Sequence, residues 1–101
     1  MSSLPSLSLE TREKTGKGAA RAVRRDGYVP GTLYGQETPE SIQILQSDFV
    51  KEMQNPGIKT RVYEFELAGK KFKGLVRAIE RDLLSELPLH FDVQKIEDLR
   101  A

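Results

Sequence analysis

The 101-residue sequence contains no cysteine and no tryptophan, and it has a single histidine. Without cysteine, the chain has no disulfide bonds, no cysteine-ligated zinc site and no thiol nucleophile. Aromatic residues make up only 7% of the chain, so its core must consist mainly of aliphatic side chains. At this length we expect one domain, residues 1–101, with one modest core.

Long apolar segments are absent as well. No run approaches the roughly 18 residues that a membrane span needs. The N-terminal MSSLPSLSLE lacks the basic start and the apolar centre of a secretory signal. We therefore expect a soluble, cytoplasmic protein with no membrane partner. The net charge of +1 argues against a bulk polyelectrolyte binder, so any nucleic acid would have to bind a localised face.

One segment departs from this near-neutral balance, REKTGKGAARAVRRDGYVPGTLYG at residues 12–35. Six of the sixteen basic residues fall in these 24 positions against two acidic residues, which leaves about +4 here and about −3 in the other 77 residues. The basic residues are Arg12, Lys14, Lys17, Arg21, Arg24 and Arg25. This asymmetry indicates a face for an anionic partner.

Apolar alternation and turn residues predict a mainly β fold with inserted helices. Strands are expected at residues 6–10, 32–34, 41–45, 62–67, 72–79 and 89–93. Helices are expected at residues 19–25, ended by Gly27, and after Ser47, which has the residue type of an N-cap. About six short strands with two helices favour a small β-barrel or curled sheet. Residues 1–5 and 97–101 are expected to be frayed tails.

The basic segment offers two candidate binding elements. Gly16-Lys17-Gly18 could let the backbone approach a phosphate, but it lacks the P-loop pattern and could equally be a flexible turn. In the helix that follows, Arg21 is three and four residues from Arg24 and Arg25, so the three share a face. They could bind phosphates or guanine edges, or they could simply be a solvated helix surface.

Later residues could extend this face. Tyr34 could stack on RNA, or it could be a half-buried strand residue. His90 and Asp92 are two apart on an expected strand, so their side chains point the same way. A His–Asp pair without a serine or cysteine nucleophile, or a second histidine for a metal, is an incomplete catalytic site. We expect the pair to form hydrogen bonds, either with RNA or as a structural pair at a strand end, and Arg77 and Arg81 could widen the same basic face. We expect no catalytic residue, metal, cofactor or small-molecule substrate.

Together, the GKGAAR, VPG-x-LYG and H-x-D elements and the closing LHFDV resemble the bacterial large-subunit ribosomal protein twenty-five family, over roughly residues 7–96. Longer members are general stress proteins of the CTC type. The resemblance implies a six-stranded β-barrel, similar to the anticodon-binding region of glutaminyl-tRNA synthetase. It implies binding to a loop E-type helix of 5S ribosomal RNA in the central protuberance of the large subunit, beside neighbouring ribosomal proteins. Carried over, the RNA-binding residues are Arg12, Lys17, Arg21, Arg24, Tyr34, Arg77, Arg81, His90 and Asp92.

The sequence departs from the family pattern in two places. Ala22 stands where members often carry a second basic residue, and DLLSELP follows Arg81 without the early proline of the family, so this loop is expected to differ. The sequence ends soon after the barrel pattern, which resembles the short form. We expect a monomer when free. Alternative functions are a stand-alone tRNA-type binding module, a protein-interaction adaptor using barrel edge strands, or a small hydrolase using His90.

Overall fold

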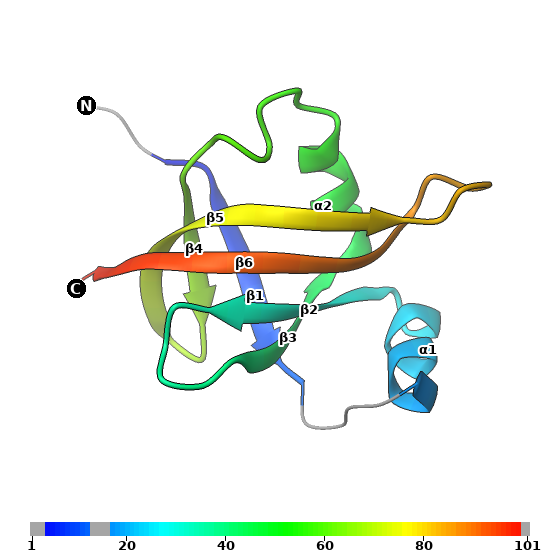
Figure 1. Ribbon diagram of the computed structural model, residues 1–101, viewed down its shortest axis with the longest axis horizontal. Helices are drawn as coiled ribbons and strands as arrows, with labels where there is room; N and C mark the ends of the chain where they lie inside the picture. Colours follow the sequence, from blue (N-terminus) through cyan, green and yellow to red (C-terminus); the bar gives the residue numbers. More distant parts are fainter. Residues whose placement is uncertain (1–3, 13–16, 100–101) are drawn as a thin grey trace.

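The computed structural model describes residues 4–12 and 17–99, which form a six-stranded barrel with two helices (Figure 1). The strands are β1 (Ser6–Thr11), β2 (Tyr28–Tyr34), β3 (Glu40–Leu45), β4 (Tyr63–Leu67), β5 (Lys70–Arg81) and β6 (Pro88–Leu99). The helices are α1 (Lys17–Arg25), between β1 and β2, and α2 (Gln46–Met53), between β3 and β4. In the described part of the chain, no helix is long and apolar enough to cross a membrane.

The strands close in the order β1-β3-β2-β6-β5-β4, with β4 returning to β1. The β1–β4 and β2–β6 pairs are parallel, and the other four pairs are antiparallel. The six strands thus form a closed barrel, in which every strand has a partner on each side along at least part of its length. The predicted mainly β barrel with inserted helices is therefore confirmed.

The barrel interior is filled by the apolar residues of the alternating strands. Leu7 and Leu9 of β1 are 6% and 4% exposed, and Phe91 and Val93 of β6 are 1% and 0% exposed. Helix α2 covers one end of the barrel with Phe49, whose ring centroid lies 4.9 Å from that of Phe91. The period of two in the sequence thus gives these strands a buried face and an outer face.

Two turn and packing positions depend on small or permissive residues. A Cβ atom on Gly31 would lie 2.5 Å from Cε1 of Phe91, so this glycine of β2 makes room for a core ring. The β4–β5 hairpin turns through Ala68 and Gly69, both with positive φ (53° and 81°), as the right-handed twist of two-residue hairpins requires.

Several element boundaries differ from the sequence prediction. Strand β2 begins at Tyr28, because Pro30 is accommodated within it opposite Gln43. Strand β6 continues to Leu99, and Glu97 pairs with Lys73 in register and through an ion pair of 3.3 Å. Residues 97–99 are therefore strand residues, and the prediction of a frayed tail is wrong for them, because the long β5 provides a partner.

The N-cap prediction for α2 is also wrong. The helix begins at Gln46, one residue before Ser47, and Leu45 occupies the N-cap position with no side-chain hydrogen bond. Strand β3 runs directly into the helix, and the Gln46 amide donates to the Gly27 carbonyl at 2.9 Å. A backbone acceptor from the α1–β2 turn thus satisfies one of the amides that a side-chain cap would serve.

Candidate nucleic-acid interface

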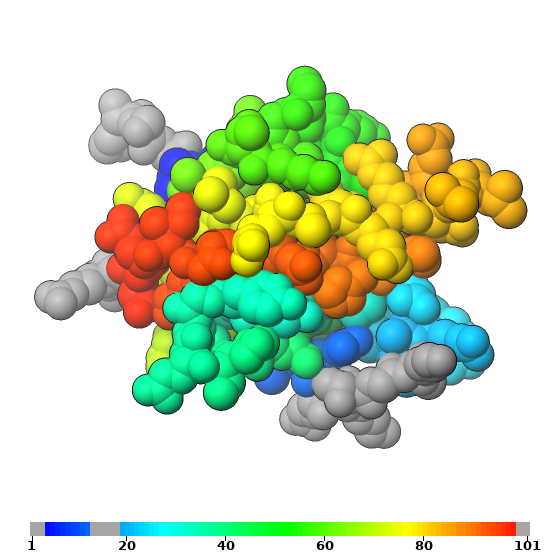
Figure 2. Space-filling view, viewed as in Figure 1, coloured from blue at the N-terminus to red at the C-terminus, as the bar shows by residue number. Residues whose placement is uncertain are grey.

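Strands β2, β5 and β6 carry a group of polar side chains on the outside of the barrel. We call this group the outer face, and Figure 2 shows the surface over these three strands. Its residues lie between the buried positions of the same strands, and they are Thr32, Tyr34, Arg77, His90, Asp92 and Gln94. The register places Thr32 beside Asp92 and Tyr34 beside Gln94, so residues 60 positions apart become neighbours.

His90 lies at the centre of a polar chain on the outer face. Its Nδ1 is 3.5 Å from Asp92 Oδ1, and its Nε2 is 3.4 Å from the Thr32 hydroxyl. The His90 and Asp92 side chains remain 38% and 29% exposed. Each ring nitrogen therefore faces an oxygen, and which of the two contacts uses the ring N–H depends on the tautomer. The expected His–Asp pair is thus present, with a hydroxyl that fixes the ring from the other side.

Asp92 retains hydrogen-bonding capacity that the protein does not use. Its Oδ1 atom is buried and has no hydrogen-bond partner within the described residues, apart from the longer approach of the imidazole. A carboxylate accepts several hydrogen bonds, and unused acceptors of this kind are uncommon in folded proteins. The Asp92 side chain as a whole is 29% exposed, so its carboxylate can present an acceptor to a ligand on the outer face.

Tyr34 and Arg77 form the second half of the outer face. The Arg77 guanidinium carbon lies 5.9 Å from the Tyr34 ring centroid, within the range of a cation–π contact. Arg77 Nη1 also donates to Gln94 Oε1 at 3.2 Å. Gly35 follows Tyr34 with φ +103°, and a Cβ there would lie 2.7 Å from Gln94 Nε2. This glycine therefore lets the chain turn away beside the stacked pair.

Helix α1 is attached to the outer face by one of its arginines. Arg24 Nη1 donates to the Leu89 carbonyl of β6 at 3.1 Å, next to His90 in sequence. Gly27 ends the helix as predicted, with φ +88° and an amide that donates to the Arg24 carbonyl at 3.1 Å. Arg24 therefore does not point outward with Arg21 and Arg25, which are both exposed. A guanidinium has five N–H donors, so this bond uses only part of its capacity.

Arg12 follows β1 and continues a row across the sheet. Its amide donates to the Ser41 carbonyl at 3.0 Å, Ser41 pairs with Thr32, and Thr32 pairs with Asp92. Its Nε and Nη1 atoms are buried and have no hydrogen-bond partner among the residues that the structure describes. No described carboxylate neutralises this guanidinium by an ion pair.

The remaining predicted residues are less closely grouped. Lys17 is the first residue of α1, two positions before the predicted start, and its side chain lies outside the described part, as does Gly16. Arg81 is exposed at the end of β5, opposite Pro88. The structure thus unites Tyr34, Arg77, His90 and Asp92, joins Arg24 to them, and leaves Arg81 at the margin. Thr32 and Gln94 were not predicted as site residues. Each nevertheless lies two positions from a predicted site residue on the same strand, Tyr34 for Thr32 and Asp92 for Gln94.

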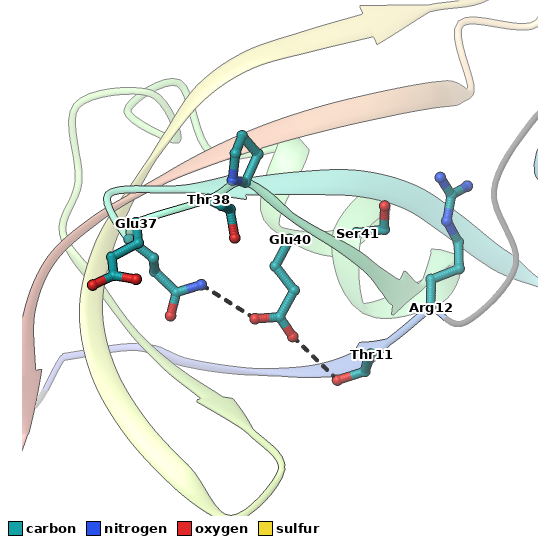
Figure 3. A pocket seen from close by; sticks show the side chains of 8 residues that line it. Thr11, Arg12, Glu37, Thr38, Glu40 and Ser41 are labelled. Atoms are coloured by element: carbon teal, nitrogen blue, oxygen red, sulfur yellow. Dashed lines mark hydrogen bonds between the residues drawn. The ribbon is translucent and has the colours of Figure 1, made fainter.

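A pocket of about 520 Å³ has Arg12 in its lining but differs in character from the outer face (Figure 3). Glu40 crosses it, accepting from Gln36 at 3.2 Å and from Thr11 at 3.3 Å. Glu37 adds a second carboxylate to the lining. Two carboxylates against the single guanidinium of Arg12 give the lining a net negative charge, which disfavours a phosphate ligand here. Nor do the described residues contain a cluster of three or more His, Asp or Glu that could hold a metal ion.

The chain is similar in sequence to known proteins. Residues 7–93 match the model of the ribosomal L25p family. The chain is 37% identical over 97 residues to the large ribosomal subunit protein bL25 of Methylobacterium nodulans, covering 95% of this chain and 46% of that protein. The bL25 proteins of Dinoroseobacter shibae and Gluconobacter oxydans are 35% and 36% identical, over 92% and 95% of this chain and 45% of each relative.

The chain spans about half the length of the curated relatives it matches. The match nevertheless runs from Leu7 in β1 to the middle of β6, and so it includes α1 and five of the six residues of the outer face, all except Gln94. On the extent of the family match and on the similarity to these relatives, the chain belongs to the ribosomal L25p family.

Proposed function

We propose that this chain is a non-catalytic, cytoplasmic constituent of the large ribosomal subunit that binds 5S ribosomal RNA at a loop E-type helix in the central protuberance. Membership of the ribosomal L25p family supports the ribosomal part of this proposal. The choice of RNA rests on the resemblance of the GKGAAR, VPG-x-LYG and H-x-D elements to a 5S RNA-binding family.

The outer face is the observation that carries the proposal. It combines an aromatic ring next to a guanidinium, an imidazole with two hydrogen-bonding neighbours, and a carboxylate, all partly exposed on one surface. Base edges in an irregular RNA helix offer amino and carbonyl groups that Asp92 and His90 can bind. Regular A-form RNA hides these edges in a deep groove, so a widened, noncanonical helix is the fitting target.

The basic residues of α1 have a different role from that of the outer face. Arg21 and Arg25 project from α1 into solvent, where they can bind phosphates and fix the register of the protein on the RNA. The bond from Arg24 to the Leu89 carbonyl sets the position of α1 against the outer face. Phosphate contacts thus supply affinity, while Tyr34, His90 and Asp92 supply discrimination.

A salt titration of binding to purified 5S RNA, with tRNA as competitor, tests the proposal. Binding in the nanomolar range that survives excess tRNA and falls steeply with salt is the expected result. Equal binding to both RNAs would favour a generic tRNA-type module instead. The absence of measurable affinity for either RNA at any salt concentration would overturn the proposal.

A further inference from the structure

The loop between β5 and β6 carries two leucines that the barrel does not cover. Leu83 and Leu84 are 96% and 95% exposed, far more than the other exposed large apolar residues of the described chain, which lie between 43% and 49%. The loop extends beyond the barrel as a projecting tip, on the same side of the molecule as α1 (Figures 1 and 2). We call residues 82–87 the leucine tip. Adjacent leucines held out in water are an interaction feature that folding alone does not require.

The shape of the tip is fixed by its own hydrogen bonds. The Asp82 carboxylate accepts from the Leu84 amide at 3.3 Å and from the Ser85 hydroxyl at 3.0 Å. The Asp82 amide donates to the Leu87 carbonyl, and the Glu86 amide donates to the Asp82 carbonyl, both at 2.9 Å. Glu86 is held at φ +62°, an uncommon conformation for a residue with a side chain. The two leucines are therefore presented by a preorganised loop, which lowers the entropic cost of docking.

The charges around the leucines indicate the chemistry of the partner. Asp82 and Glu86 lie within the tip, and Glu80 and Arg81 lie at its base, so the four groups sum to −2. This balance is opposite in sign to that of α1, and it repels RNA phosphates. It also repels an anionic lipid surface. A protein pocket with an apolar floor and a basic rim satisfies both the leucines and the carboxylates.

We propose that the leucine tip docks into such an apolar, basic-rimmed pocket on a neighbouring protein of the large subunit. This inference rests on the proposed function, because proteins that neutralise RNA phosphates carry the lysines and arginines that would form the rim. The basic helix and the leucine tip then divide one end of the molecule between two partners. The helix faces RNA, and the tip faces protein.

The test compares three forms of the chain: wild type, the double variant Leu83→Ser/Leu84→Ser, and Ile96→Ser. Ile96 is a matched control, because it is an exposed apolar residue (49%) on β6 outside the tip. Affinity is measured for free 5S RNA and for large subunits purified from cells that lack this chain. Free 5S RNA should bind all three forms within about twofold. The double variant should bind the depleted subunits at least tenfold more weakly than the other two, because two leucines lose their burial.

A photoreactive benzoylphenylalanine at position 84 identifies what the tip touches in the loaded subunits. An adduct with a ribosomal protein, at a site lined by apolar and basic residues, is the expected result. Equal affinity of the double variant and wild type for the subunits would overturn the docking proposal, and so would adducts with RNA alone or with a second copy of this chain. If wild type bound neither 5S RNA nor subunits, the proposed function would fail too, and the free-RNA arm would show this separately.

Discussion

The two faces of β2 and β6 differ sharply although they belong to the same strands. Facing inward, Val29, Leu33, Phe91 and Val93 are at most 1% exposed. Facing outward, Thr32, His90 and Asp92 are polar and partly exposed, and they meet across the strands through His90. The inner face therefore determines whether the chain folds, and the outer face can vary its chemistry without cost to the core. Substitutions at adjacent positions should separate the two.

The largest effect is expected on the inner face, from Phe91→Ala. This ring is 1% exposed, fills the space left by Gly31 and packs on Phe49, so its removal leaves a cavity. The free energy of unfolding in urea should fall by about 3–5 kcal/mol. The neighbouring His90→Ala should change it by less than about 1 kcal/mol. If Phe91→Ala does not fold, the milder substitution Phe91→Leu can be used, and it should still lower the free energy of unfolding more than His90→Ala does. Equal losses in the free energy of unfolding from His90→Ala and Phe91→Ala would contradict the division of β6 into an inner face that stabilises the fold and an outer face that does not.

A smaller effect is expected at Tyr63, which brings a hydroxyl to the inner face. Its side chain is 0% exposed and donates to Glu52 Oε1 at 2.9 Å. Burial, together with the hydrogen bond to Glu52 and the charge of this carboxylate, raises the pKa of Tyr63 to about 12. Tyr63→Phe should lower the free energy of unfolding by about 1–3 kcal/mol near neutral pH, since it removes a bond to a carboxylate.

The pH dependence of this loss has a definite sign. A raised pKa means that the folded state holds the phenol proton after the unfolded chain has released it, near its ordinary pKa of 10. The contribution of Tyr63 is therefore complete below pH 10 and falls as the pH rises towards 12, by an amount on the order of 2 kcal/mol. Urea denaturation of wild type and Tyr63→Phe at several pH values should show the gap narrowing in this range. A constant gap would mean that Tyr63 titrates alike in both states.

On the outer face, Asp92→Asn should alter the choice of RNA with little change in stability. The substitution preserves size but removes the charge beside His90 and replaces one acceptor with a donor. The preference for 5S RNA over tRNA should fall by about 1–3 kcal/mol, if the value for a single base contact applies. Glu66→Gln on β4, an exposed carboxylate outside the outer face, is the matched control. Parallel weakening for both RNAs would assign Asp92 to general affinity.

The sequence predicted the inner face more completely than the outer face, for a physical reason. Strand alternation is local, so Leu7, Leu9 and Phe65 could be assigned to the core from spacing alone, and all are buried. Tyr34 and Arg77 meet only because the barrel brings β2, β6 and β5 side by side, which spacing does not encode. Thr32 was missed because a threonine in a strand carries no functional signal by itself. The family resemblance supplied the candidate residues, and the register shows which of them meet.

The smallest effect is expected from Arg21→Ala, which concerns affinity without discrimination. Arg21 is exposed on α1, whereas Arg24 of the same helix donates to a backbone carbonyl of β6, so only Arg24 has a described role in holding the helix. Loss of one phosphate contact should reduce the slope of log affinity against log salt by about one and weaken binding by about 1 kcal/mol near 0.1 M salt, equally for 5S RNA and tRNA. Arg61→Ala, an exposed arginine before β4, should leave both quantities unchanged. A loss confined to 5S RNA would move Arg21 from the positioning residues to those that read the RNA, and the helix would then share the role assigned here to the outer face.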